Sequence, residues 1–204
     1  KYSEKIAVHE KDDFLKSLLI IGKQIKQIEN LVNEFSDFAR MPKPILKDNN
    51  LVSLIKDNIK LINELDDKII IDFKASKADI LLNSDNEQLS RVFFNLIKNS
   101  IESIQEKKIN NIDLIGKIDI YLNDNAEKIN FSIIDNGLGF GIFADNLNDI
   151  LNPYFTTKKK GTGLGLAIVN KIINDHNGKI NFIPILGKMQ QIQIARNIKC
   201  TRKS

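Results

Sequence analysis

Apolar side chains recur with helical spacing along the first forty residues. They follow steps of four and three in strict alternation, at Phe14, Leu18, Ile21, Ile25, Ile28, Val32, Phe35 and Ala39. This spacing is typical of the seam along which one helix packs on another in a bundle or coiled coil. A helix packed on a sheet of its own domain is the alternative interpretation. A strict repeat over more than three heptads favours the helical bundle.

The predicted helix ends near Met41. Pro42 and Pro44 each lack an amide hydrogen, and each disfavours helical geometry in the residue before it. This short segment is therefore a predicted hinge and domain boundary. It divides the chain into residues 1–44 and a second domain over residues 45–204.

The hydrophobic pattern changes beyond the prolines. Helices are predicted over Leu51–Leu65, Glu87–Gln105 and Leu164–Asp175, and strands over Lys68–Lys74, Gly116–Leu122 and Lys128–Ile134. Asn123–Asn125 is the predicted turn between the last two strands, and Asn177–Gly178 should end the last helix in a left-handed conformation. This order predicts an α/β fold, an α+β two-layer sandwich in which helices cover a mixed sheet.

The C-terminal region leaves two possibilities open. Glutamine and isoleucine alternate over residues 190–194, which is compatible with an edge strand after the last helix. The same residues are also compatible with an eroded end of the domain, which would leave the sheet less stable.

Composition excludes only a few classes of protein. The 204 residues are 42% hydrophobic and 27% charged, as in ordinary soluble domains, and no apolar run approaches the ~18 residues of a membrane span. Because the chain begins with Lys1 rather than Met, we expect a piece of a longer protein, which is compatible with a membrane anchor upstream. The single Cys200 indicates a reducing compartment. The net charge of +4 is interpreted as a solvated basic surface, and nucleic acid is not an expected partner.

Two asparagines form the first candidate cluster. Asn95 and Asn99 are four residues apart, so they lie on one face of the helix predicted over Glu87–Gln105. A side-chain amide oxygen is a hard ligand that suits Mg²⁺. In an asparagine-rich chain, however, composition alone also accounts for such a pair.

The second cluster is Asp135–Gly141, which directly follows an apolar strand. An aspartate at a strand end is suited to accept a hydrogen bond from an amine such as that of adenine, and alternate glycines let the backbone approach a ligand. A plain glycine-rich turn is the alternative.

The remaining clusters lie in and after a long polar segment over residues 142–163. Within Asn152–Lys158, the aromatic residues are suited to anchor a mobile lid and Lys158 to contact a phosphate, although a loop with a hydrophobic plug is the alternative. Gly161–Leu166 leads into a helix, where backbone amides and the helix dipole favour phosphate. This segment lacks the lysine and hydroxyl residue that end a Walker A loop, and it lacks the dinucleotide fingerprint.

In order and spacing, the four clusters closely resemble the N, G1, F and G2 boxes of histidine kinases, within the wider superfamily of gyrase, Hsp90 and MutL. The resemblance covers about residues 47–183. It implies a Bergerat-type ATP-binding fold with ATP and Mg²⁺ as cofactors. The positions that it places at the nucleotide are Asn95, Lys98, Asn99, Asp135, Gly137, Gly139, Gly141, Phe155, Thr157, Lys158, Gly161, Thr162, Gly163, Leu164, Gly165 and Leu166.

The resemblance also implies a role for the principal positions. Asn99 would hold the metal, Asp135 would read the adenine amine, and Phe155 would anchor the lid. The glycines of the second cluster would shape the adenine side of the pocket. The phosphates would be wrapped by the fourth cluster, through Gly161, Gly163, Gly165 and the amides of Leu164 and Leu166.

Asn95 helps to choose among members of the superfamily. The ATP-hydrolysing members carry a glutamate here that activates water, and an amide is no general base at neutral pH. Transfer to a protein acceptor is therefore favoured over hydrolysis.

Residues 33–44 resemble the end of the second dimerisation helix in nitrogen-regulation sensor kinases of the NtrY type. This resemblance implies a homodimer formed through the N-terminal helix and a response regulator that receives the phosphoryl group. It also implies that the chain is the cytoplasmic portion of a membrane-anchored sensor kinase. Residues 1–44 would then be the second helix of a dimerisation and histidine phosphotransfer domain.

The phosphoacceptor histidine is expected upstream of Lys1. His9–Glu10 begins like the family's acceptor motif, but Lys11–Phe14 does not continue it and contains no proline. His176 lies beside a predicted helix cap and is interpreted as structural. The rival interpretation is a catalytically inert dimerisation and interaction module with a degraded ATP-binding fold, and an ATP-hydrolysing relative is a third.

Overall fold

The structure of the chain is a computed structural model. The structure describes residues 2–65, 68–125, 128–139, 149–156, 158, 161–185 and 189–197. It divides into two compact units, Lys1–Pro42 and Lys43–Ser204. The division falls next to the proline segment that was predicted as a hinge.

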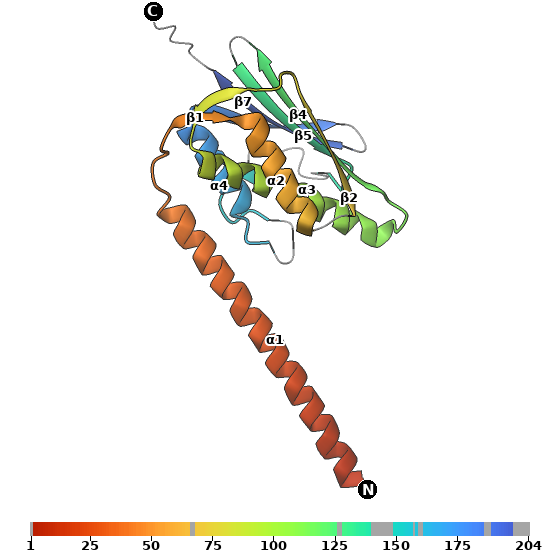
Figure 1. The fold of residues 1–204 in the computed structure, drawn as a ribbon. Helices are drawn as coiled ribbons and strands as arrows, with labels where there is room; N and C mark the ends of the chain where they lie inside the picture. The colour runs from red at the N-terminus through yellow and green to blue at the C-terminus, as the bar shows by residue number, and fades with distance from the viewer. Residues whose placement is uncertain are drawn as a thin grey trace, which may run out of the picture. The chain divides into compact units, whose positions relative to one another are not determined.

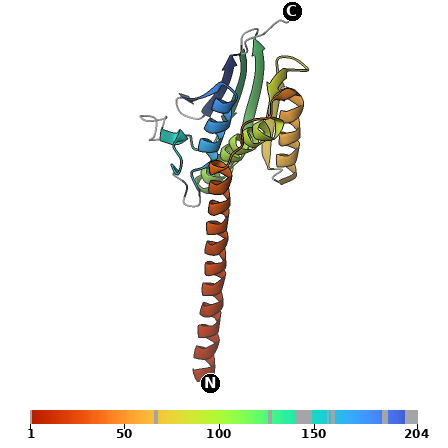
Figure 2. The same ribbon diagram turned by 90° about the vertical axis from the view of Figure 1, so that its left-hand side faces the viewer.

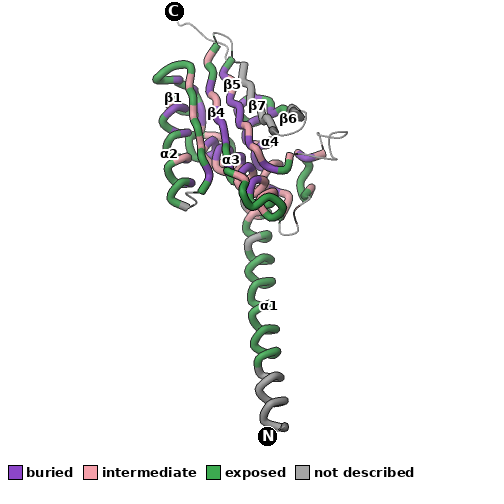
Figure 3. Tube along the Cα trace, turned by 90° about the vertical axis from the view of Figure 1, so that its right-hand side faces the viewer, coloured by how far each residue is buried: buried purple, intermediate pink, exposed green. Residues whose placement is uncertain are grey.

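The first unit consists of one helix, α1 (Tyr2–Ala39), which confirms the helix predicted there (Figure 1). Exposed residues run along this helix, in green in Figure 3. The seam residues Phe14, Ile21, Ile25 and Ile28 are each more than half exposed. An amphipathic helix of this kind gains most of its stability from packing, and the exposed stripe matches the seam predicted for a helical bundle. In the described part of the chain, no helix is long and apolar enough to cross a membrane.

The second unit is a two-layer α/β sandwich with a mixed sheet. Its elements are β1 (Lys47–Asn50), α2 (Leu51–Leu65), β2 (Ile69–Ala75), β3 (Leu81–Ser84), α3 (Asn86–Asn110), β4 (Gly116–Asn125), β5 (Lys128–Asp135), α4 (Gly165–Asp175), β6 (Gly178–Ile185) and β7 (Met189–Asn197). Five strands form a sheet in the order β2-β4-β5-β7-β6, and β1 pairs with β3 separately. Strands β2 and β4 are parallel, and the other neighbours are antiparallel. Helices α2, α3 and α4 form a layer beside the sheet (Figure 2), which confirms the predicted fold.

Period-two patterning places the core between the sheet and the helices. Ile118, Ile120 and Leu122 of β4 are fully buried. The ring of Phe131 on β5 lies 4.9 Å, centroid to centroid, from that of Phe93 on α3. Each such side chain contributes about 1.5–3 kcal/mol by leaving water. This packing fixes α3 against β4 and β5, and α3 carries one side of the candidate site.

Several details differ from the sequence predictions. Helix α3 runs to Asn110, beyond the predicted end at Gln105. The predicted turn at Asn123–Asn125 is wrong, because these residues continue β4 and pair with β5. The predicted edge strand is also misplaced: β7 lies between β5 and β6, so β6 forms the edge. Strands β1 and β3 were not predicted, and each contains only four residues.

The N-terminus of α3 and the C-terminus of α4 are joined by hydrogen bonds. The Asp85 carboxylate accepts from the amides of Gln88, at 3.0 Å, and Ile45, at 2.8 Å. His176 is buried; its Nε2 accepts from the Asp85 amide at 3.0 Å, and its Nδ1 lies 2.8 Å from the Ile172 carbonyl oxygen. With both ring nitrogens in hydrogen bonds, His176 has the structural role interpreted from sequence. The next residue, Asn177, has φ 55°, the predicted left-handed helix end.

Candidate functional site

Helix α3 brings the predicted asparagines to one face, which adjoins α4. Asn95 and Asn99 are both half-buried. A Cβ added to Gly165, at the start of α4, would lie 3.7 Å from Asn95 Oδ1. Lys98 is exposed and pairs with Glu102 at 3.9 Å. The first and fourth clusters of the sequence are therefore neighbours in space.

Asp135 ends β5 as a buried carboxylate with 4% exposure. Its Oδ1 accepts from the Gly137 amide at 2.9 Å, and its side chain also bonds that of Ser100. Burial raises the pKa of the Asp135 carboxyl, while these hydrogen bonds and the positive charges of Lys107 and Lys158 act in the opposite direction. The site therefore holds a desolvated acceptor that is balanced by nearby donors and cations.

The turn after Asp135 packs directly against α3. A Cβ on Gly137 would lie 2.7 Å from both Asp135 Oδ1 and the carbonyl carbon of Ser103. Only glycine fits such an approach without displacing backbone. Gly139 has φ 87°, a conformation that side chains other than glycine's disfavour. The second cluster is thus shaped by its contact with α3 and by the conformation of its own backbone.

Lys158 joins the third cluster to α3. Its ammonium nitrogen contacts the Glu102 carboxylate and lies 3.4 Å from Asn99 Oδ1. The oxygen proposed from sequence as a metal ligand therefore faces a cation in this structure. Because Lys158 also acts electrostatically on Asp135, the second and third clusters share one electrostatic environment.

The glycine-rich segment before α4 is built around close backbone contacts. Gly163 has φ 70°, and a Cβ there would lie 2.5 Å from the carbonyl carbon of Tyr154. The Tyr154 amide donates to the Gly163 carbonyl at 3.1 Å, and Tyr154 itself has φ 69°. A Cβ on Gly161 would lie 2.5 Å from Thr156 Oγ1. Phe155, the predicted lid anchor, is half-buried beside this contact.

The glycine-rich segment leads into the N-terminus of α4, as predicted. Leu164 is fully buried, its amide donates to Thr162 Oγ1 at 3.3 Å, and its carbonyl accepts from Ile168. Gly165 and Leu166 lie in the first turn and are half-buried. The positive end of a helix dipole at this position favours a negatively charged group such as phosphate.

Two predicted positions, Gly141 and Thr157, lie outside the described residues. Sequence reasoning also missed four polar residues of α3 that contact the site. These are Ser100, Glu102, Ser103 and Lys107. Ser100, Ser103 and Lys107 are spaced by three and four, which places them on one stripe of a helix. This spacing gave no signal in the sequence, because the helix was predicted to end at Gln105, before Lys107.

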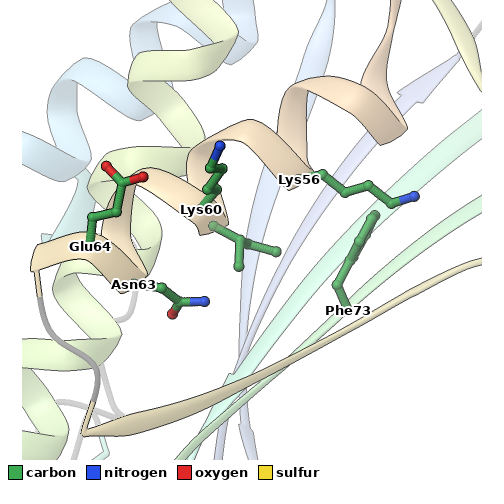
Figure 4. A pocket seen from close by; sticks show the side chains of 6 residues that line it. Lys56, Lys60, Asn63, Glu64 and Phe73 are labelled. Carbon is green, nitrogen blue, oxygen red and sulfur yellow. The ribbon is translucent and has the colours of Figure 1, made fainter.

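An open pocket of about 560 Å³ lies elsewhere, between α2 and β2 (Figure 4). Its lining residues are Lys56, Ile59, Lys60, Asn63, Glu64 and Phe73. None of them belongs to the four clusters. The described residues of the four clusters therefore lie around α3 and the start of α4, away from this pocket.

Comparison with known proteins places the fold and the sequence in one group. The family described as histidine kinase-, DNA gyrase B- and HSP90-like ATPase matches residues 84–197. The nitrogen regulation protein NtrY of Azorhizobium caulinodans is 36% identical over 160 residues, which cover 78% of this chain and 20% of that protein. The sensor histidine kinase ZraS of Escherichia coli is 28% identical over 90% of this chain and 38% of its own length.

Solved structures of histidine kinases are also similar to this chain. The catalytic domain of histidine kinase ThkA superposes with a TM-score of 0.64 at 29% identity, covering 75% of this chain and 97% of that domain. ThkA in complex with the response regulator protein TrrA shares the fold with a TM-score of 0.69 at 24% identity, over 87% of this chain and 49% of that one. The chain spans less than half the length of the curated relatives named above. Because the family match covers more than half of its residues, the chain belongs to the histidine kinase-, DNA gyrase B- and HSP90-like ATPase family.

Proposed function

We propose that this chain binds Mg-ATP and, within the intact protein, serves as the catalytic part of a sensor histidine kinase. The observation that carries the proposal is the arrangement around α3. A buried carboxylate (Asp135), an ammonium (Lys158) and an amide oxygen (Asn99) meet there beside the glycine-rich start of α4. These groups match the base, the phosphates and the metal of one nucleotide.

The adenine end of the proposed site is the Asp135 carboxylate. It is buried and remains an acceptor with lone pairs beyond the bond from the Gly137 amide. A hydrogen bond between this carboxylate and the exocyclic amine of adenine is worth about 1.5–3 kcal/mol. Gly137 and Gly139 would shape this side of the pocket, as the family resemblance implies.

The phosphate end is formed by Lys158 and the first turn of α4. The helix dipole and a point charge both favour a polyphosphate there. Asn99 fits a metal ion because its Oδ1 is a hard oxygen that already faces a cation, the Lys158 ammonium. When bound, ATP would supply the transferred phosphoryl group and Mg²⁺ would neutralise charge on the phosphates.

Asn95 directs the reaction toward a protein acceptor. Its amide lies beside the start of α4. The resemblance implies that the ATP-hydrolysing members of the superfamily have a glutamate at the position of Asn95. Because an amide cannot remove a proton from water at neutral pH, we expect slow hydrolysis and transfer to a histidine. That histidine is proposed to lie upstream of Lys1, in the first helix of the dimerisation domain.

We propose that residues 1–44 form the second helix of that dimerisation domain and residues 45–204 the ATP-binding catalytic domain. The exposed seam of α1 supports homodimerisation through this helix. ThkA forms a complex with a response regulator, and a response regulator is the proposed partner of this chain too. As the family resemblance implies, the chain would be the cytoplasmic portion of a membrane-anchored sensor kinase. The family membership disfavours the rival interpretation, an inert interaction module.

Calorimetric titration with a non-hydrolysable ATP analogue tests the nucleotide site. We expect binding that tightens with Mg²⁺, and an Asp135→Asn variant that binds at least about tenfold more weakly because a charge-assisted hydrogen bond is lost. Asn99→Ala should abolish the effect of Mg²⁺ while binding persists. A folded wild-type chain that binds no nucleotide would contradict the proposal and favour the inert module.

A further inference from the structure

We infer that Lys107 and Ser103 are positioning residues that fix the turn after Asp135 and thereby set the selectivity of the site for adenine. The inference rests on the proposed function. It concerns two α3 side chains outside the four sequence clusters.

Three consecutive residues of the turn are anchored to α3. The Lys107 ammonium donates to the carbonyl of Asn136 at 2.7 Å and to that of Gly137 at 2.9 Å. Ser103 Oγ accepts from the amide of Leu138 at 3.0 Å. Lys107 is half-buried, so these charge-assisted bonds are partly shielded from water and hold the turn firmly.

The opposite side of the turn is fixed by the sheet. Asn136 Nδ2 donates to the carbonyl of Ile115 at 2.8 Å, and its Oδ1 accepts from the Lys117 amide at 2.9 Å. The Asn136 amide donates to the Lys117 carbonyl at 3.2 Å. The turn is therefore held between β4 and α3. Of these two attachments, only the one to α3 depends on a charged side chain.

This turn also fixes the position of the Asp135 carboxylate. Asp135 Oδ1 accepts from the Gly137 amide at 2.9 Å, so a displacement of Gly137 would release the carboxylate from its position. The Lys107 charge also favours the ionised form of Asp135 and opposes the effect of burial on its pKa. Both effects keep a fixed, negatively charged acceptor in the pocket.

Such an acceptor discriminates between bases. Adenine presents an amine donor at its 6-position, whereas hypoxanthine presents a carbonyl, which would be left unpaired and repelled by the carboxylate. A site built to bond one group rejects the analogue that lacks it, because its buried polar atoms lose their partner. When the turn is loosened, the carboxylate can move away, and the penalty against hypoxanthine becomes smaller.

The experiment compares the dissociation constants of ADP and IDP, which differ at the 6-position of the base, by calorimetry on the full chain. Lys107→Met should lower the IDP-to-ADP ratio by about tenfold, which corresponds to about 1.4 kcal/mol. Lys107→Arg, which keeps the charge and donors, should recover most of the ratio. Ser103→Ala should lower it by a smaller factor.

Lys108→Met is the matched control, because the Lys108 ammonium lies 3.6 Å from the Cβ position of Gly116, at the start of β4. It should retain the wild-type ratio. An unchanged ratio in Lys107→Met, or an equal loss of affinity for both nucleotides, would overturn the inference. If thermal melting shows that Lys107→Met is unfolded, Ser103→Ala decides by the same ratio. A wild-type chain that binds neither nucleotide would instead overturn the proposed function.

Discussion

The ammonium nitrogen of Lys158 lies 3.4 Å from the side-chain oxygen of Asn99. The same ammonium contacts the carboxylate of Glu102, one turn further along α3. One cation thus links the proposed metal ligand to a carboxylate that the sequence motifs did not include. The pair of Lys158 and Glu102 is about one-third exposed, so we expect its strength to be modest and sensitive to salt.

Removal of the Glu102 charge should strengthen the binding of triphosphates. The carboxylate lies where we place the phosphates, and it also competes with them for Lys158. We expect Glu102→Gln to tighten the binding of a non-hydrolysable ATP analogue by about two- to fivefold, equivalent to at most about 1 kcal/mol. The gain in affinity should be smaller for ADP than for the ATP analogue, and smaller at higher salt concentration. Calorimetry at two ionic strengths measures both differences.

Glu106→Gln is the matched control for this variant, because Glu106 lies on the same helix and is exposed. It removes one negative charge, as Glu102→Gln does, and should leave the affinities for the ATP analogue and for ADP unchanged. Weaker triphosphate binding in Glu102→Gln would mean that Glu102 supports the site instead of competing with the ligand.

Asp135→Asn should stabilise the free chain at neutral pH. Burial raises the pKa of Asp135 in the folded state, so folding favours its protonated form. The ionised carboxylate therefore costs stability above the folded-state pKa, and this cost is relieved as the pH falls toward the ordinary aspartate pKa of about 3.9. We expect the variant to be more stable than wild type at pH 7, with an advantage that shrinks in acid. Urea unfolding across this pH range is the measurement.

Asp119→Asn provides the comparison, since Asp119 is a buried carboxylate on the neighbouring strand that pairs with Lys117 at 2.8 Å. Its replacement removes an ion pair and should give no gain at pH 7. If Asp135→Asn were as unstable as this control, hydrogen bonds from its neighbours would outweigh the burial of its charge.

Local patterns predicted most of the fold because they report which face of an element is buried. The amphipathic stretch Leu51–Leu65 coincides with α2, and the apolar run ending at Ile134 matches β5. The position of β7 within the sheet was beyond such patterns, since strand order depends on contacts distant in sequence. Strands β1 and β3 pair over only four residues, too short for a period-two signal.

The glycine clusters of the site were predictable, but their supports were not. Glycines at unusual conformations, such as Gly163, leave a direct signal in sequence. Lys107 lies beyond the predicted end of its helix, in a charged stretch that resembles a solvated surface. The role proposed for Lys107 depends on the longer α3, which places its ammonium at the carbonyls of Asn136 and Gly137.

Gly163→Ala should disrupt the segment before α4. The residue has φ 70°, and an added Cβ would lie 2.5 Å from the Tyr154 carbonyl carbon, so strain and overlap act together. Strain of this kind costs about 1–3 kcal/mol. We expect a lower melting temperature and weaker binding of the ATP analogue. Gly22→Ala, with nothing within 4 Å of its Cβ position on α1, should instead stabilise its helix by about 0.5–1 kcal/mol. An equal response of the two variants would contradict the assigned backbone constraint.

Asp85→Ala should destabilise the catalytic unit at neutral pH. The carboxylate caps α3 through the Gln88 amide and also accepts from Ile45, and loss of such a cap costs about 1–2 kcal/mol. Burial acts to raise the pKa of Asp85, but the hydrogen bonds from Gln88, Ile45 and Glu87 outweigh it, so the pKa is lowered in the folded state.

The lowered pKa fixes the pH dependence of this contribution. It is fully present above the unfolded pKa of about 3.9 and is lost as the pH falls through the folded value. The difference in unfolding free energy between wild type and Asp85→Ala should therefore narrow in acid. Asp57→Ala, at an exposed position of α2, should change stability little at any pH. A difference that stayed constant down to pH 3 would argue against the carboxylate as its source.

Ile28→Glu should dissociate the proposed homodimer. Ile28 lies on the seam of α1 and is 61% exposed in the single chain, so a second copy would bury it on both helices. Burial of one isoleucine is worth about 1.5 kcal/mol or more, so loss of two should weaken the dimer at least about a hundredfold. Gln27→Glu adds the same charge at the neighbouring position and should leave the dimer intact. Sedimentation equilibrium measures both variants. A wild-type chain that is monomeric at high concentration would contradict homodimerisation through α1.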